Sequence, residues 1–243
     1  DVYKRQTIKP EEAVIGYVGA FSFAEVISGM TSYFLGARSV CPSVTMKVQF
    51  VGSWSDATEE SNAASDLCDR GCKLISQHSD NTTPATTAQS KGVFHTGYNN
   101  DMTGVAPDAS IIGCRIDWAP YFVYAIESVA NGQAFDQDFC KGYADGSVVL
   151  TELNEKIAAP GTAEKLAEVE AGLADGSIKV FDTSTFTIGG ETLTNAFALD
   201  TDGDFTPDAE EAVFDGAFHE SYFQSAPYFA IKIDGIEWLN SAF

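Results

Sequence analysis

Basic side chains are scarce in this sequence. Lys and Arg number 14 against 35 Asp and Glu in 243 residues, which gives a formal net charge of −21. So acidic a surface repels nucleic-acid phosphates, and we therefore exclude nucleic acid as a partner. Long apolar runs are lacking as well. The longest stretches without a charged residue, Ala13–Ala24 and Val26–Ala37, have 12 residues each, whereas a helix needs ~20 apolar residues to cross a bilayer.

The motifs of common enzyme classes are missing too. The sequence contains neither of the glycine-rich nucleotide-binding fingerprints, G-x-G-x-x-G and G-x-x-x-x-G-K-[ST], and no G-x-S-x-G nucleophile elbow. Only 3 His are available for general-base catalysis. We therefore predict no catalytic residue and no cofactor, and we expect a protein that is not an enzyme.

The cysteines do not form a metal-binding pattern. Cys68 and Cys72 stand four residues apart, but no second Cys or His pair at metal spacing accompanies them, so no metal site is predicted. Buried free thiols are the favoured interpretation of the 5 cysteines. A disulfide is the alternative if the protein works outside the cytoplasm.

Strand and helix patterns alternate through the first half of the chain, with short links between them. The predicted strands are Ala13–Gly19, Met46–Val51, Lys73–Ser76, Val93–Tyr98 and Ser110–Ile116. The predicted helices are Phe23–Arg38, Asp56–Arg70, Pro84–Lys91 and Pro120–Asn131. This order is typical of an α/β fold in which right-handed crossovers build a parallel sheet covered by helices on both faces.

The alternation fails after about Gln133. A Gly-rich turn and a strand are predicted within Lys141–Leu150, a helix at Thr162–Ala174 and a strand at Ile178–Phe181. The acidic segment Asp200–Glu211 has the oxygen-ligand spacing of a calcium-binding loop, but Phe205 stands where the sharp turn needs glycine. We interpret this segment as a solvated acidic turn, with an adventitious Ca²⁺ site as the alternative. This half of the chain does not close a second α/β layer by itself.

A candidate binding site follows from the predicted topology, because parallel sheets bind ligands beyond the carboxyl ends of their strands. The loops at those ends combine aromatic rings with hydrogen-bonding groups, which suits a small polar molecule with a flat face. The residues of this kind in the loops are Phe21, Phe23, Trp54, Asp56, His78, Asp80, Asn99, Asp101 and Trp118, and all of them except Phe23 are retained as candidate ligand-binding residues on the resemblance given below.

Several of these residues have a structural alternative. Phe21 and its neighbour Phe23 can belong to the core, as most phenylalanines do. Asp56 can be only a helix N-cap, and His78 can be a structural histidine. The two tryptophans stand just after strands among polar neighbours, where full burial is harder, so ligand contact is favoured for them.

The chain contains a series of distinctive motifs: VGAFSFAEVI (18–27), GARSVCP (36–42), GSWSD (52–56), QHSD (77–80), GYNNDM (97–102), the segment 142–150, DGAFHESY (215–222) and SAPYF (225–229). In sequence and in order, these motifs resemble the basic membrane protein (BMP) family, the PnrA-like substrate-binding lipoproteins of bacterial ABC transporters. The resemblance covers about residues 10–243.

The resemblance implies a two-lobed protein of the type I periplasmic-binding-protein fold, in which this chain starts at the second lobe. Residues 1–9 are then linker or non-native sequence, 10–135 a complete second lobe, and 136–243 the hinge crossing and the segment that completes the otherwise partial first lobe. The site residues given above are the positions that the resemblance carries over. Asn99 departs from the pattern, because relatives often have an aspartate there, and this places nucleoside specificity in question.

The function implied by the resemblance is that of an extracytoplasmic solute-binding component of an ABC importer. Its partners would be a small-molecule ligand, with a purine nucleoside expected, and the permease subunits. The protein would meet the membrane only through a lipid anchor that this sequence does not include. Two alternatives stay open: a ligand-sensing regulatory protein of the same fold, and an α/β enzyme.

Overall fold

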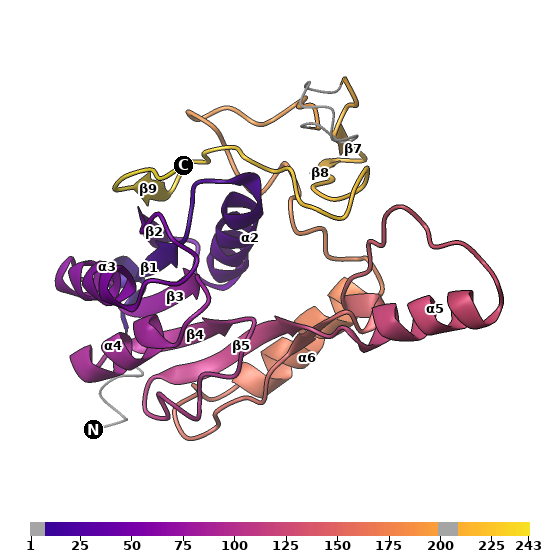
Figure 1. Cartoon of the computed structure of the whole chain (residues 1–243). Coiled ribbons are helices and arrows are strands. Elements are labelled where there is room, and N and C mark those ends of the chain that lie inside the picture. The colour runs from indigo at the N-terminus through magenta and orange to yellow at the C-terminus, as the bar shows by residue number, and fades with distance from the viewer. Residues whose placement is uncertain (1–7, 199–208) are drawn as a thin grey trace.

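A seven-stranded sheet organises the molecule in the computed structural model, which describes residues 8–198 and 209–243. The strand order is β6-β5-β4-β3-β1-β2-β9 (Figure 1). The strands are β1 (Val14–Gly19), β2 (Thr45–Phe50), β3 (Leu74–His78), β4 (Phe94–Tyr98), β5 (Ser110–Ile116), β6 (Val148–Leu150) and β9 (Ile236–Trp238). Neighbouring strands are parallel except β5 and β6, which are antiparallel. The predicted parallel α/β sheet is therefore confirmed.

Helices cover both faces of the central strands. Helix α2 (Ala24–Val40) packs on one face, while α3 (Ala57–Asp69) and α4 (Thr83–Lys91) pack on the other (Figure 1). The two-residue repeat of β1 explains this arrangement, because Tyr17 joins the core under α2 whereas Val18 joins the core under α3. Gly16 lets α3 approach closely, since a Cβ there would lie 2.9 Å from the Cβ of Leu67.

The second half of the chain returns to the same core. Phe181, Phe218 and Phe229 belong to the cluster of buried residues that contains Phe34 of α2. Strand β9 pairs with β2 in parallel, and β6 extends the opposite edge of the sheet. The sheet thus takes strands from both sides of residue 135. The division at that residue stays a prediction.

One predicted strand is wrong. Residues Ile178–Phe181 form turns rather than a strand. The ring of Phe181 stacks on that of Phe229 with centroids 4.5 Å apart, whereas Ile178 and Val180 are exposed. Burial of the Phe181 ring and a backbone hydrogen bond from the N–H of Phe218 to the carbonyl of Phe181, at 3.0 Å, hold this segment. Within the described residues, the pairing continues only as an isolated bridge between Asp182 and Ala217 and forms no regular ladder. A short hairpin, β7 (Val213–Phe214) with β8 (Ala217–Phe218), lies beside it.

Two helices lie outside the central layers. Helix α5 (Ala119–Ala130) projects away from strands β1 to β4 (Figure 1), and α6 (Thr162–Ala174) contacts the short helix at Tyr143–Asp145, where the Tyr143 hydroxyl donates to Glu170. Four large apolar side chains of α5 are exposed, namely Phe122, Val123, Ile126 and Val129. Within the described residues, no helix is long and apolar enough to cross a membrane.

The remaining expectations have mixed outcomes. All five cysteines are free thiols, but only Cys72 is buried, so the expectation of buried thiols is wrong for the other four. In the described part of the chain, no three His, Cys, Asp or Glu side chains are grouped as metal ligands. Residues Asp1–Gln6 and most of the candidate calcium loop, residues 200–208, lie outside the described residues.

Candidate ligand-binding site

The carboxyl ends of β1, β2 and β3 lie level with one another. Their last residues are Gly19, Phe50 and His78, and Gly19 is in register with both of the others. The loops that follow these strands therefore leave the sheet side by side, as parallel topology requires. This edge carries the site.

Aromatic rings from four elements meet there. Phe21 stacks on Phe23 with centroids 4.9 Å apart and meets the edge of Trp54 at 5.5 Å. Trp54 in turn lies 6.2 Å from the ring of His78, which lies 4.0 Å from that of Tyr98. We call these five residues the aromatic cluster. Phe21 and Trp54 are half-buried and Phe23 is exposed, so this part of the cluster is open to solvent.

His78 is the buried member of the aromatic cluster. Its side chain lies against α2 at Gly29, where a Cβ would come within 2.9 Å of Nδ1. Neither ring nitrogen makes a hydrogen bond within the described structure. Burial lowers the pKa of His78 to about 4, so the ring is neutral at pH 7.

Two carboxylates lie at the rim of the aromatic cluster. Oε1 of Glu25 lies 3.9 Å from Nε2 of His78. Partial burial raises the pKa of Glu25, and the negative charge of Asp80 raises it further. The backbone N–H of Asp80 donates to the carbonyl of Trp54 at 2.7 Å, which ties the loop after β3 to the loop after β2. Flat rings beside carboxylate acceptors suit a ligand with a planar face and hydroxyl or amine donors.

Asp56 has a structural role. Its Oδ1 accepts hydrogen bonds from the backbone N–H groups of Thr58 and Glu59, both at 3.0 Å, so it is the N-cap of α3. The N-cap alternative is confirmed. Ligand contact by the half-buried carboxylate stays a prediction.

The remaining predicted site residues occupy loops nearer β5. Oδ1 of Asn99 accepts from the N–H of Ile116 at 3.1 Å, and Asn99 adopts a positive φ of 54°. Asp101 accepts from both the N–H and the hydroxyl of Thr103. Trp118 is 56% exposed and its ring contacts lie within α5. The structure thus brings Phe21, Trp54, His78 and Asp80 together. Asn99 directly follows Tyr98 of the aromatic cluster, whereas no ring contact within the described residues links Trp118 to that cluster.

Two members of the site escaped sequence reasoning, although a signal existed for each. Glu25 stands in the first turn of the helix after β1, and Tyr98 is the last residue of β4. Both positions lie at the carboxyl edge of the sheet. Burial raises the pKa of Tyr98 to about 12, so its hydroxyl stays protonated.

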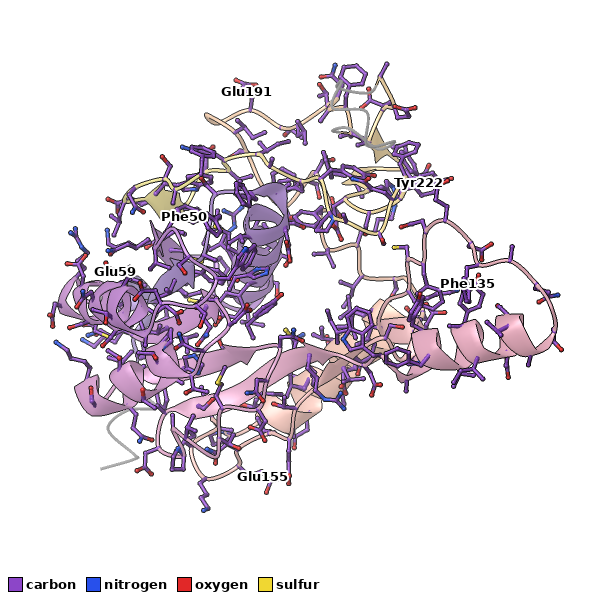
Figure 2. The ribbon with its side chains drawn as sticks, in the orientation of Figure 1. Phe50, Glu59, Phe135, Glu155, Glu191 and Tyr222 are labelled. Carbon is purple, nitrogen blue, oxygen red and sulfur yellow. The ribbon has the colours of Figure 1, made fainter. Side chains whose placement is uncertain are left out.

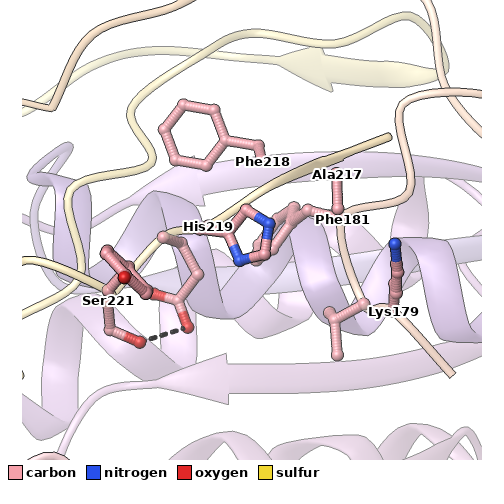
Figure 3. Close-up of a pocket in the computed structure, with 9 residues that line it drawn as sticks. Lys179, Phe181, Ala217, Phe218, His219 and Ser221 are labelled. Atoms are coloured by element: carbon pink, nitrogen blue, oxygen red, sulfur yellow. Dashed lines mark hydrogen bonds between the residues drawn. The ribbon is translucent and has the colours of Figure 1, made fainter. Parts of the chain in front are cut away.

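A separate pocket lies in the second half of the chain. It has a volume of about 330 Å³ and is lined by residues 179–181 and 217–222. Figure 3 shows His219 in its middle, with Lys179 and Ser221 toward opposite ends. Glu220 accepts from the hydroxyls of Ser221 and of Ser28 on α2, and burial raises its pKa. None of the predicted site residues lines this pocket.

The fold is that of solute-binding proteins. The structure resembles an ABC transporter solute-binding protein from Conexibacter woesei with a TM-score of 0.56 and 18% identity, over 74% of this chain and 60% of that one. It also resembles a transcriptional activator of the comK gene from Bacillus halodurans with a TM-score of 0.60 and 16% identity, over 73% and 61% of the two chains. Identities this low establish the fold alone.

Residues 8–177 match the family of PnrA-like ABC transporter substrate-binding proteins, and the chain belongs to that family. A purine-binding protein of Brucella abortus is 33% identical over 172 residues, which are 70% of this chain and 48% of that protein. A candidate ABC transporter glucose-binding protein of Haloferax volcanii is 31% identical over 176 residues, 72% and 45% of the two chains. The chain thus spans about half the length of these relatives. The family is one of binding proteins, not of enzymes.

Proposed function

We propose that this chain belongs to an extracytoplasmic solute-binding protein that delivers a purine nucleoside to an ABC importer. The observation that carries the proposal is the aromatic cluster with its carboxylate rim, at the level carboxyl ends of β1, β2 and β3. Membership of the PnrA-like family and the similarity to a purine-binding protein support it.

The chemistry of the site suits a nucleoside. A purine ring stacked on Trp54 or Phe21 gains ~1–3 kcal/mol, and that gain is similar for every base because every base has a π-face. Glu25 and Asp80 can accept hydrogen bonds from ribose hydroxyls or from the amino groups of a base. Discrimination among bases then rests with the polar groups and not with the rings.

The mechanism that we propose is closure of two lobes around the ligand. Residues 10–135 would form the second lobe, with the hinge crossing near Gln133–Gly142 and the later segment completing the first lobe. A lipid anchor would tether the protein outside the cytoplasm, and the permease subunits would receive the closed form. Asp56, Asn99, Asp101 and Trp118 join the ligand contacts in this proposal.

Calorimetric titration of the purified protein with adenosine, guanosine, inosine and glucose tests the ligand class. We expect heat with at least one nucleoside and weaker binding of all nucleosides by Trp54→Ala, roughly tenfold if the loss is ~1.4 kcal/mol. Heat with glucose alone would favour a sugar, which the Haloferax relative suggests as the second candidate. No heat with any nucleoside would overturn the purine assignment.

Trp118→Ala addresses the start of α5 in the same titration. If the two-lobed protein closes over Trp118, this variant also weakens all nucleosides by a similar factor, roughly tenfold. An unchanged affinity would remove Trp118 from the site while leaving the cluster around Trp54 in place.

Gene neighbourhood separates the transporter from the sensor alternative, since permease and ATPase genes accompany the transporter.

A further inference from the structure

We propose that Glu60 is a positioning residue for this binding site, holding at a fixed spacing the loop that carries Trp54 and the loop that follows His78 at the end of β3. The inference rests on the proposed function for its ligand, but its geometry stands independently of any ligand. Glu60 lies in the first turn of α3 and its side chain is fully buried, with an exposed fraction of 0%. A helix carboxylate in that position would ordinarily face solvent.

Both oxygens of the Glu60 carboxylate accept hydrogen bonds. Oε1 accepts from the backbone N–H of Asp56 at 3.0 Å and from the side-chain amide of Asn81 at 2.7 Å. Oε2 accepts from the hydroxyl of Ser79 at 2.9 Å. The first donor belongs to the loop after β2, and the other two belong to the loop after β3. One buried carboxylate therefore connects the two loops.

These hydrogen bonds offset the desolvation cost of the buried carboxylate, a cost that an apolar core residue would not have. Burying a carboxylate is unfavourable unless its lone pairs are filled. Within the described residues, no Lys, Arg or His forms an ion pair with Glu60, and burial raises its pKa. An apolar side chain would suit packing under α3 better. The carboxylate instead fixes the positions of its three donors, because the N–H of Asp56, the amide of Asn81 and the hydroxyl of Ser79 must all point toward it.

The loop after β3 is also fixed from its other side. The side-chain amide of Gln77 donates to the carbonyls of Ser79 at 2.9 Å and Asn81 at 2.7 Å, so its oxygen faces Nε2 of His95 at 3.1 Å. Nε2 of His95 therefore carries the proton, and Nδ1 accepts from Ser110 at 3.3 Å. The loop is held from β4 and β5 on one side and from α3 on the other.

This network acts on the site through the backbone. Gln77 and His78 are consecutive in β3, so their side chains lie on opposite faces of the sheet. Gln77 and Glu60 lie on the α3 face, whereas His78 lies against α2. Within the described residues, the hydrogen bonds of Glu60 go to Asp56, Ser79 and Asn81 and to no member of the aromatic cluster, so its proposed role is to set the spacing of the loops.

Hydrogen exchange tests the positioning role without a ligand. Glu60→Leu should speed amide exchange at Asp80, whose N–H bonds to Trp54, by about tenfold or more. Glu60→Gln should preserve slow exchange, because its carbonyl can still accept from Asp56 and Asn81 while its NH₂ donates to Ser79. Glu59→Gln is the matched control, since Glu59 is exposed on the outer side of α3 (Figure 2).

Titration with adenosine adds the functional readout. We expect Glu60→Leu to weaken adenosine binding about tenfold and Glu60→Gln to restore it to within about threefold of wild type. Ser79→Ala, which removes a single donor, should also speed exchange at Asp80 and covers the case in which the leucine variant does not fold. Wild-type exchange at Asp80 in every variant that folds would overturn the proposal. Fast exchange at Asp80 in Glu60→Leu and Ser79→Ala, combined with a wild type that does not bind adenosine, would instead overturn the proposed ligand.

Discussion

Two buried histidines in neighbouring strands have opposite surroundings. Both ring nitrogens of His95 have hydrogen-bond partners, whereas those of His78 have none within the described structure. Burial lowers the pKa of His95 to about 3 and that of His78 to about 4, against an ordinary value of ~6.5. Both are therefore neutral in the folded protein over the range in which an unfolded chain protonates them.

This difference predicts a loss of stability in acid. Between pH 6.5 and about pH 4 the unfolded chain binds a proton at each histidine and the folded chain does not, so the free energy of unfolding falls as the pH falls. The slope is at most ~1.4 kcal/mol per pH unit for each histidine. Glu25, Glu60 and Glu220 act with the opposite sign, since their raised pKa values favour the folded protein as the pH falls.

Replacement of one histidine separates these contributions. Between pH 7 and pH 5 the free energy of unfolding should fall in both proteins, and we expect the fall to be smaller in His95→Gln than in the wild type by up to ~2 kcal/mol. Urea unfolding at both pH values measures it. Gln can still donate to Gln77 in place of the ring. The same pH dependence in variant and wild type would show that His95 binds its proton as readily in the folded protein as in the unfolded chain.

Asn99 offers a second test at the scale of a single residue. Its side-chain carbonyl accepts from the N–H of Ile116, so the amide NH₂ is the group available as a donor to a ligand. Asn99→Asp keeps the bond to Ile116 and exchanges that donor for an acceptor. We therefore expect a changed order of affinities among adenosine, guanosine and inosine, measured by calorimetry. A uniform shift of all three would place Asn99 outside the specificity contacts.

At the scale of elements, the N-terminus of α3 joins a helix cap to the site. Asp56 satisfies two backbone donors of the first turn, and Glu60 reaches back to the N–H of Asp56. Asp56→Ala should lower the free energy of unfolding by about 1 kcal/mol, the usual effect of losing an N-cap, while Asp56→Asn should retain most of it. Urea denaturation measures both. Equal losses would mean that the negative charge, rather than the cap, stabilises the helix.

Elements with a strong local pattern could be predicted from the sequence. The apolar run of β1 predicts a buried strand, and the apolar spacing of α2 predicts a helix. The alternating order of such elements then implies a parallel sheet. The aromatic loops at its edge followed from that topology. Strand β9 could not be predicted, because three residues near the end of the chain pair with β2 only after the whole fold has formed. The burial of Glu60 could not be predicted either, since an acidic residue in a first helical turn ordinarily faces solvent.

At the scale of the whole molecule, the two halves differ in how they are held. Residues 14–116 supply five adjacent strands and the helices that cover them. Between β6 and β9, the described chain has one helix, α6, and the two-residue strands β7 and β8. That region joins the core through buried side chains such as Phe181, Phe218 and Phe229 rather than through a ladder of long strands. Its end is better anchored, because Asn240 bonds the backbone of Phe50 in both directions.

Limited proteolysis with trypsin should therefore cut the second half first. Lys156, Lys165 and Lys179 are exposed, but so are Lys73 and Lys91 at the ends of sheet-bound elements, which makes the latter two a matched control. Cleavage requires local opening, and opening is cheapest where few buried contacts and few ladder hydrogen bonds must be broken. We expect early fragments that end at the three later lysines and retain an intact segment from Lys9 to Arg115, identified by mass spectrometry. Cuts at Lys73 or Lys91 that accumulate as fast would contradict the expectation that residues 10–135 form the more stable unit.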